Sequence, residues 1–310
     1  MIDFLHSHIP DPVFFQMGAI TIHWYGVCIV LGFLLGLWIS LRLADRYELP
    51  RKVIYDMCFY GLIFGLIGDR LYYVIYAWEF YRNDLLSIVK IWEGGLAIHG
   101  GIIGGAVTLL VFTKYSTSRT DWNAWMHKTF KVKNVPWILY FWFLTDLAVV
   151  ILISGLAIGR YGNYFNQELF GTPTDLPWGI PIEQEFVPQI YETATYFHPT
   201  FLYESIGDIL ILGALVMLHR KRLKSLRDMG NTKTRSLSEP YLLPFGTITM
   251  VGLSLYSILR FFNEFLRIDY SPVVFGIRWA QIASIVLLVA VLLVYRFHVF
   301  PLQKKLETRV

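Results

Sequence analysis

Charged residues and cysteines are both scarce in this sequence. Only 16% of its 310 residues are charged, whereas 55% are hydrophobic and 17% are aromatic. A soluble domain averages about 25% charged residues, so much of the surface must face something other than water. The two cysteines, Cys28 and Cys58, lie within long apolar runs and have no metal-ligand spacing. We interpret both as small apolar packing residues and expect neither a disulfide nor a metal site.

Two further features are missing. No internal repeat is visible, which weakens a transporter interpretation because many transporters are built from related halves. The first residues carry no basic segment and no small-residue cleavage site, which a removable signal peptide would have. We therefore expect the first apolar run to remain in the protein as a membrane anchor.

Long apolar runs are what the sequence does have. A bilayer core requires about 20 apolar residues per helix, and we assign seven such spans. They cover residues 22–41, 53–77, 97–115, 136–158, 199–218, 244–264 and 277–296. The predicted fold is an all-α integral membrane protein with seven transmembrane helices in a single membrane domain, residues 1–310.

The basic residues orient these spans. Of the 27 lysines and arginines, 20 lie on one side of the predicted membrane. Four follow the first span, five the third, seven the fifth and four the seventh. The positive-inside rule then puts the N-terminus outside and the C-terminus in the cytoplasm, which seven spans satisfy and six or eight would not. Because the basic clusters fit cytoplasmic loops, the net charge of +4 is a topological signal, and we expect no nucleic-acid partner.

The connections between the spans differ in character. The segment before the first span, with Pro10, Pro12 and Gly18, predicts short extended structure at the outer interface. Residues 84–92 are apolar at helical spacing but too short to span, so we place them flat on the outer surface. Residues 165–197 carry five carboxylates and four prolines and predict a small extracytoplasmic cap without a core of its own. The basic segments 116–135 and 219–241 predict cytoplasmic loops.

Polar groups inside the predicted spans gather in the outer half of the bilayer. An ionisable residue there costs several kcal/mol and is a functional hypothesis by default. Five spans contribute such groups at one depth: Asp69, Arg70, Tyr73, His99, Arg160, His198, Tyr203, Glu204, Tyr256, Arg260 and Glu264. A channel or carrier needs a polar path through both halves, and only Asp56, Asp146 and Asp208 lie deeper. A one-sided cluster favours chemistry on a substrate that enters from the outer leaflet.

The stretch GRYGNYFNQELFG (159–171) is the densest motif. Arg160, Asn163 and Asn166 recur every three residues and share one face of a helical turn, and Glu168 follows closely enough to orient Arg160 or a substrate hydroxyl. An arginine can hold a phosphate with two parallel hydrogen bonds. The alternative is an interfacial arginine that reaches the lipid headgroups.

The stretch EGGLAIHGGIIGG (93–105) surrounds His99 with six glycines. Glycine lets backbone or lipid approach closely, a helix N-terminus would offer free N–H groups to an anion, and a neutral His99 would accept a proton near pH 7. Equally, the glycines would permit tight helix packing while His99 caps a turn.

Three other patterns carry similar alternatives. One stripe along a helix is formed by Tyr256, Arg260, Glu264 and Arg267. In it, Glu264 would hold Arg260 in place, and the two residues would be either a catalytic pair or a structural ion pair. The motif His198-Pro199 with Tyr203-Glu204 marks a helix start. The carboxylate of Glu204 would point inward and have either a structural or a catalytic role. The aromatic residues of the motif HWYG (23–26) would belong either to the ordinary aromatic belt at the membrane interface or to a functional site.

Taken together, these motifs resemble those of the prolipoprotein diacylglyceryl transferases. The motifs are HWYG (23–26), GDRLYY (68–73), EGGLAIHGG (93–101), GRYGNYFNQELFG (159–171), HPTFLYE (198–204) and YSILRFFNEFLR (256–267). Their order and spacing match across nearly the whole chain, and the GRxGNxxNxExxG pattern is highly specific. The resemblance implies a multi-pass enzyme of the bacterial cytoplasmic (inner) membrane with its active site toward the extracytoplasmic side.

Enzymes of this family transfer the diacylglyceryl group of phosphatidylglycerol to the lipobox cysteine of a preprolipoprotein signal peptide. A thioether forms and glycerol phosphate leaves, in the first step of bacterial lipoprotein maturation. The predicted catalytic residues are His99, Arg160, Arg260 and Glu264. The predicted phosphatidylglycerol-binding residues are Tyr25, Arg70, Tyr73, Gly100, Gly101, Asn163, Asn166, Glu168, Gly171, Glu204 and Tyr256.

The inventory of residues agrees with that chemistry. The attacking thiol belongs to the substrate, which explains why no nucleophilic constellation is found. A base such as His99 or a nearby carboxylate would form the thiolate, and the two arginines would stabilise the charge on the departing phosphate. No cofactor is expected, because phosphatidylglycerol is already an activated donor. The resemblance also aligns Asp146 with an intramembrane aspartate, and residues 116–135 are longer than is usual for the family.

Three other functions remain for comparison. A transporter or lipid flippase would continue its polar residues to the cytoplasmic face. A non-catalytic scaffold would not need two arginines and a histidine at one depth. An alcohol phosphatidyltransferase would carry a double-aspartate metal motif, which this sequence lacks.

Overall fold

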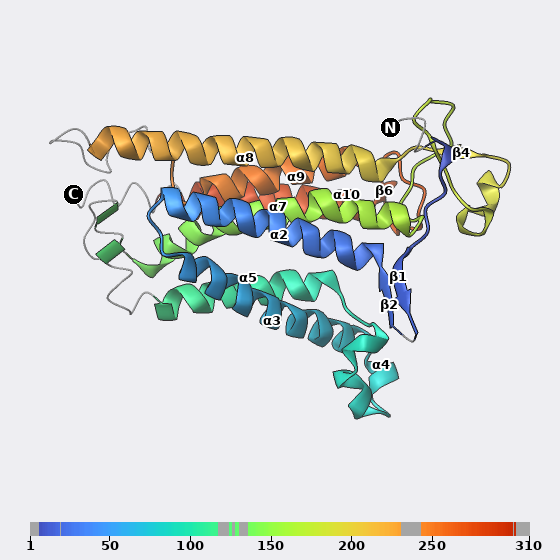
Figure 1. Cartoon of the computed structure of the whole chain (residues 1–310), viewed down its shortest axis with the longest axis horizontal. Helices are drawn as coiled ribbons and strands as arrows, with labels where there is room; N and C mark the ends of the chain where they lie inside the picture. The colour runs from blue at the N-terminus through green and yellow to red at the C-terminus, as the bar shows by residue number, and fades with distance from the viewer. Residues whose placement is uncertain are drawn as a thin grey trace.

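The computed structural model describes residues 6–18, 20–116, 124–125, 128–129, 136–230, 243–299 and 301. Within this part, nothing is described of the side chains of Glu93, Ile98, His99, Ser116 and Met229. Long helices lying side by side make up most of the molecule (Figure 1).

A helix corresponds to each predicted span. These helices are α2 (Trp24–Arg46), α3 (Arg51–Tyr76), α5 (Ile98–Ser116), α7 (Trp137–Phe165), α8 (Thr200–Gly230), α9 (Thr247–Asn263) and α10 (Trp279–Val294), which continues as a π-helical turn, η5 (Tyr295–Val299). Pro50 and Pro136 directly precede α3 and α7. Proline suits such helix starts because its fixed φ suits a helix and its missing N–H has no intrahelical partner to lose.

Within the described residues, five helices are long and apolar enough to cross a membrane. They are α2, α3, α7, the stretch Thr200–Asp228 of α8, and the stretch Trp279–Val299 that begins with α10. Large apolar side chains such as Trp38, Leu62 and Leu210 are exposed on these helices, which suits a lipid environment. The prediction of a helical membrane protein is confirmed at this level. The helices α5 and α9 are shorter, with 19 and 17 residues, and seven crossings stay a prediction.

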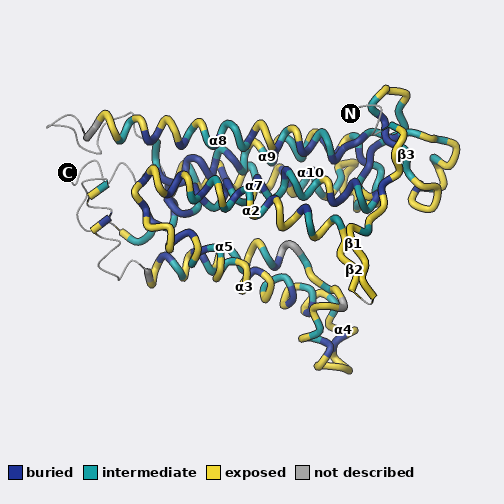
Figure 2. The backbone as a smooth tube through the Cα atoms, in the orientation of Figure 1, coloured by how far each residue is buried: buried dark blue, intermediate teal, exposed yellow. Residues whose placement is uncertain are grey.

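Helix α7 lies at the centre of the bundle and packs against α2, α5, α8 and α9. Buried residues concentrate on α7 and on the inner faces of its neighbours (Figure 2). Phe143, Leu144 and Leu147 of α7, Leu215 of α8 and Ile248 of α9 have at most a trace of exposed surface and form the core. The N-terminal half of α7 is therefore buried between α8 and α9.

Helices α3 and α5 form a separate pair at the lower edge of Figure 1. Their backbones meet at Gly68 and Gly100, where a Cβ added to Gly100 would overlap the carbonyl oxygen of Gly68 and lie 2.6 Å from Cβ of Tyr72. Only glycine allows this approach. Beyond α3 the chain makes a short helix, α4 (Trp78–Tyr81), and two 3-10 turns, η1 (Leu85–Val89) and η2 (Ile91–Glu93).

Three antiparallel two-stranded hairpins accompany the helices in the described chain. They are β1 (Val13–Met17) with β2 (Ile20–His23), β3 (Ile180–Pro181) with β4 (Tyr196–Phe197), and β5 (Val273–Val274) with β6 (Ile277–Arg278). The first hairpin lies where extended structure was predicted. All three lie at one end of the bundle (Figure 1).

The predicted cap, residues 165–197, contains β3, β4 and two 3-10 turns, η3 (Gln184–Phe186) and η4 (Gln189–Tyr191). A small hydrophobic cluster underlies it, in which Phe170, Ile180 and Phe197 pack with Tyr164 of α7 and Phe201 of α8. The cap thus shares its core with the helix ends.

The two predicted cytoplasmic loops are less completely described. Most of 116–135 lies outside the described residues, as do residues 231–242. The first part of 219–241 is not a loop, because α8 continues to Gly230.

Candidate active site

The carboxylate of Glu204 bridges two arginines from two other helices. Glu204 lies near the start of α8 and is 3% exposed. Its Oε2 is 2.5 Å from Nε of Arg160 on α7, and its Oε1 is 2.6 Å from Nη1 of Arg260 on α9. Asn263 also donates to Oε1 at 2.8 Å. One buried carboxylate therefore sets the relative positions of both predicted phosphate-binding arginines.

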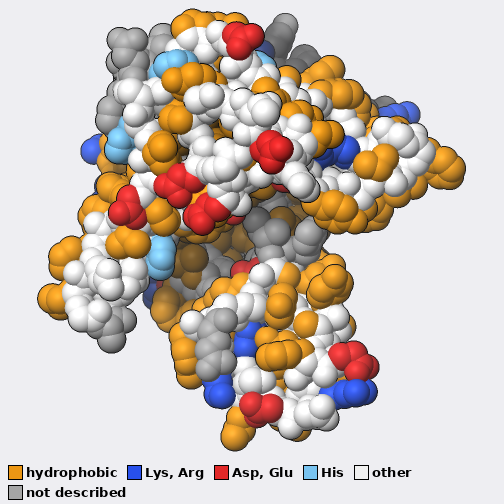
Figure 3. Space-filling view, turned by 90° about the vertical axis from the view of Figure 1, so that its right-hand side faces the viewer, with side chains coloured by type: hydrophobic (Ala, Val, Ile, Leu, Met, Phe, Trp, Pro, Cys, Tyr) orange, Lys and Arg blue, Asp and Glu red, His pale blue; other side chains and the backbone are white. Residues whose placement is uncertain are grey.

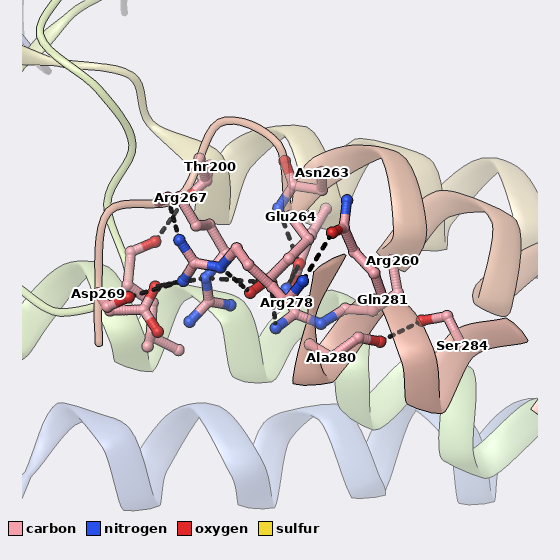
Figure 4. Close-up of polar contacts among 12 residues, drawn as sticks. Thr200, Arg260, Asn263, Glu264, Arg267, Asp269, Arg278, Ala280, Gln281 and Ser284 are labelled. Carbon is pink, nitrogen blue, oxygen red and sulfur yellow. Dashed lines mark hydrogen bonds and ion pairs between the residues drawn. The ribbon is translucent and has the colours of Figure 1, made fainter. Parts of the chain in front are cut away.

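The chain of alternating charges continues through Glu264 (Figure 4). Nη2 of Arg260 is 2.8 Å from Oε2 of Glu264, and Arg278 donates from Nε to Oε1 of Glu264 at 2.7 Å. We call Arg160, Glu204, Arg260, Glu264 and Arg278 the ion-pair chain. Arg260 in the last turn of α9 and Glu264, which caps this helix, lie one turn apart and form the central link of the ion-pair chain.

The ion-pair chain carries three guanidinium groups and two carboxylates, which leaves one positive charge. Arg160 and Arg260 keep 14% and 17% of their side-chain surface exposed, and Arg160 Nη1 and Arg260 Nε have no partner among the described residues. A partly buried site with one unbalanced positive charge suits one anion of single charge, because the low dielectric strengthens the attraction.

Two tyrosines complete the surroundings of Arg160. Arg160 donates from Nη2 to the hydroxyl of Tyr256 at 3.4 Å. Tyr25, at the start of α2, packs against Gly162, two residues after Arg160, so closely that a Cβ there would lie 2.6 Å from its ring. The structure thus brings both predicted tyrosines to the arginine.

Glu168 folds back onto the end of α7. Asn163 donates to Oε1 of Glu168 at 2.8 Å and Asn166 at 3.4 Å. Gln167 and Leu169, on either side of Glu168, have φ values of 52° and 59°. Left-handed backbone is costly for such residues and clusters at functional sites. Asn163 in the last turn of α7 and the following Asn166 and Glu168 therefore form one cluster at the C-terminal end of this helix.

Gly171 lies where three segments meet. Its N–H donates to the carbonyl of His198 at 2.9 Å, and it forms a β-bridge with Arg267. A Cβ at this position would lie 2.8 Å from His198 and 2.9 Å from Thr200. Gly171 therefore holds the cap against the start of α8 and the chain after α9.

His198 contributes to the same junction. Its Nδ1 lies 3.0 Å from the hydroxyl of Tyr203, which also accepts from Trp178 at 2.9 Å. Burial lowers the pKa of His198 below its usual value. His198 and Tyr203 thus connect the start of α8 to Trp178 of the cap.

Arg70 and Tyr73 are placed differently. Arg70 is 6% exposed, and its guanidinium donates to backbone carbonyls between Ser87 and Gly95: those of Ser87, Ile88, Lys90, Gly94 and Gly95. Tyr73 packs edge-on against Tyr81 at 6.3 Å between ring centroids. No contact joins either residue to the ion-pair chain in the described part of the molecule. Arg70 organises the connection between α3 and α5.

The glycine stretch around His99 forms the start of α5. Gly100 packs on Gly68, as described above, and Gly101 donates its N–H to Oδ1 of Asp69 at 2.6 Å. Tight helix packing, one of the two interpretations of these glycines, is thus present. The side chain of His99 lies outside the described residues, so its predicted role as a base stays a prediction.

Three residues near the ion-pair chain were not among the predicted site residues. Arg278 donates to Glu264, and Asn263 donates to Glu204. Asp208, one turn after Glu204 on α8, is fully buried, and neither carboxylate oxygen has a hydrogen-bond partner among the described residues. Asn263 lies inside a motif, and its spacing of three from Arg260 was a usable signal. Arg278 ends the hairpin of β5 and β6 and had no such signal.

The end of the molecule that carries the cap is hollowed (Figure 3). The hollow separates the lobe of α3, α5 and the connection between them from the lobe that includes the cap. Arg160 and Arg260 lie near the C-terminal ends of α7 and α9, and Glu204 near the start of α8, so the ion-pair chain lies toward this end of the bundle.

Known proteins resemble this chain over most of its length. The sequence model of the family described as "Prolipoprotein diacylglyceryl transferase" matches residues 12–297. A phosphatidylglycerol–prolipoprotein diacylglyceryl transferase of Trichormus variabilis is 38% identical over 276 residues, with 89% of this chain and 85% of the relative covered. Relatives of the same name from Halalkalibacterium halodurans and Prochlorococcus marinus are 36% and 34% identical, covering 93% and 96% of this chain and 86% and 93% of the relatives. The chain belongs to the prolipoprotein diacylglyceryl transferase family.

Proposed function

We propose that this protein transfers the diacylglyceryl group of phosphatidylglycerol to the lipobox cysteine thiol of preprolipoproteins. The family and the names of the relatives support the overall reaction. The observation that carries the assignment to a site is the carboxylate of Glu204, which brings Arg160 and Arg260 together. Two guanidinium groups with free N–H donors are a suitable cradle for the single charge of a phosphodiester.

In the proposed reaction, the cysteine thiol first loses its proton. Its sulfur then attacks the glyceryl carbon that carries the phosphate, a C–S bond forms, and the C–O bond to the phosphate breaks. Glycerol phosphate leaves with one more negative charge than the diester had. Arg160 and Arg260 stabilise that charge in a site with little water, and His99 or a nearby carboxylate takes the thiol proton. The lipid site around the arginines is shaped by Tyr25, Asn163, Asn166, Glu168, Gly171 and Tyr256. Its wall on the side of α3 and α5 is supported by Arg70, Tyr73, Gly100 and Gly101.

The same proposal includes a topology. Seven helices cross the bacterial inner membrane, with the C-terminus in the cytoplasm and the ion-pair chain toward the extracytoplasmic side. The asymmetry of basic residues supports it, as does the position of the cap at the end of the bundle that carries the site (Figure 1). The substrate lipid then enters from the outer leaflet.

An assay in detergent with phosphatidylglycerol and a lipobox peptide tests the function. It follows thioether formation and glycerol phosphate release for the wild type, Arg160→Ala and Arg260→Ala. Each variant should lose at least about a hundredfold in rate, as the loss of one charge-stabilising donor does, while it still inserts in the membrane. Arg82→Ala is the control, because Arg82 forms an exposed pair with Glu79. Near-normal rates for both site variants would contradict the assignment.

A further inference from the structure

Arg278 lies at the end of the ion-pair chain and outside every motif of the sequence. It is the last residue of β6 and directly precedes α10. Its backbone N–H donates to Oε1 of Gln281 at 3.1 Å, which fixes the start of α10. Its side chain is 20% exposed and points toward the end of α9 (Figure 4).

All three guanidinium nitrogens of Arg278 are occupied. Nε donates to Glu264 at 2.7 Å, Nη1 to the carbonyl of Arg267 at 2.6 Å, and Nη2 to the carbonyl of Asp269 at 2.6 Å. A planar fork with fixed donors can do this and a lysine ammonium cannot, because its three donors radiate from one atom. Arg278 therefore has a defined orientation relative to α9.

The partner carboxylate is almost fully buried. Glu264 is 1% exposed and assigns one oxygen to each neighbour, Oε1 to Arg278 and Oε2 to Arg260. Without Arg278, Oε1 would lose its hydrogen bond in a buried place, and the carboxylate would turn toward Arg260 or toward Arg267, whose Nε is 3.7 Å from Oε2. Either movement changes where the guanidinium of Arg260 lies.

Charge gives a second effect. Arg278 supplies one of the three positive charges of the ion-pair chain, and its Nη2 also lies 3.6 Å from Oδ1 of Asp269. Its removal would leave two guanidinium groups against two carboxylates and would weaken the attraction for an anionic phosphate.

We infer that Arg278 is a positioning residue for the transfer reaction, which acts through Glu264 to hold Arg260 and supplies the positive charge that favours the phosphodiester. The inference rests on the proposed function. A purely structural role, the closing of the turn between α9 and α10, is the competing explanation, since two of the three acceptors are backbone carbonyls.

The test measures kcat and KM for phosphatidylglycerol with a lipobox peptide for four proteins: the wild type, Arg278→Gln, Glu264→Gln and the double variant. Arg278→Gln should lower kcat/KM by about tenfold, within the range of coupling between contacting residues, and should raise KM for the anionic lipid. In the Glu264→Gln background, the same change should cost only about threefold, because the contact with Glu264 is already gone and only the effect of the charge remains. Arg82→Gln is the matched control and should leave both constants unchanged.

Each outcome decides the question. A rate within twofold of the wild type for Arg278→Gln, or equal losses in both backgrounds, would overturn the inference. If Arg278→Gln does not accumulate in the membrane, Arg278→Lys replaces it, because it keeps the charge but not the fork; it should lose about threefold to tenfold in kcat, again only when Glu264 is present. A wild type without transfer activity would refute the proposed function itself, whereas an active wild type with a normal Arg278→Gln would refute only the role of Arg278.

Discussion

Asp146 and Arg222 form an ion pair of 2.8 Å in which neither side chain has any exposed surface. Asp146 lies on α7 and Arg222 on α8. The same carboxylate accepts from the backbone N–H groups of Gly246 and Thr249 at the start of α9. Arg222 also donates to the carbonyl of Pro244 at 2.8 Å. The pair therefore ties three helices together, and the intramembrane aspartate of the sequence has a structural explanation.

We predict that Asp146→Asn destabilises the protein by about 3–5 kcal/mol, because it leaves the charge of Arg222 without a counter-ion in the core. Thermal or denaturant unfolding in detergent measures this. The double variant Asp146→Asn with Arg222→Met should recover part of the loss, since it removes the stranded charge. A double variant less stable than Asp146→Asn alone would contradict this account.

Glu204→Gln should affect both stability and activity. The change removes the negative charge between Arg160 and Arg260, so the two guanidinium groups repel each other. We expect a loss of about 3 kcal/mol in stability and of about tenfold or more in transfer rate. Glu79→Gln is a matched control, because Glu79 also forms an ion pair, at 2.8 Å with Arg82, but the two side chains are 79% and 54% exposed. This change should alter stability by less than about 1 kcal/mol. Equal effects of the two changes would argue against the bridging role.

Two glycines of α5 offer a test of the contact between α3 and α5. Gly100→Ala would push a methyl group into the carbonyl of Gly68, and we expect it to cost about 1–3 kcal/mol or more. Gly105→Ala, on the same helix, meets nothing within 4 Å and should change stability by less than about 1 kcal/mol. Melting temperatures of the purified variants compare them. If both melt at the same temperature, the two helices do not pack at Gly100.

His198 should make stability depend on pH. Burial lowers the pKa of His198 in the folded protein below its usual value of 6.5. As the pH falls through 6.5, the unfolded chain therefore takes up a proton before the folded protein does, and this uptake favours the unfolded state. Stability should therefore decline as the pH falls below about 6.5 and level off once the folded His198 is itself protonated. Melting curves at several pH values should show a smaller decline for His198→Asn. An identical pH dependence in the variant would exclude His198 as its source.

The sequence alone determined the class of the protein and most of the candidate site. Apolar runs of membrane length and a one-sided distribution of lysine and arginine follow directly from the cost of placing polar groups in lipid, so they can be read without coordinates. Spacing along one helix was equally informative. Arg260 and Glu264, four residues apart, do pair, and Asn163, Asn166 and Glu168 do meet after α7.

Only the tertiary structure decided how separate motifs meet. Nothing in the sequence pairs Glu204 of α8 with both Arg160 and Arg260, or connects Arg278 to Glu264, because these partners lie 14 to 56 residues apart and are joined only when α7, α8, α9 and the last hairpin pack together. The same holds for Arg70, whose donors reach backbone carbonyls of the connection between α3 and α5. Helix periodicity fixes which residues share a face, whereas the partner of a buried charge depends on which helix packs beside that face, and packing is a property of the whole chain.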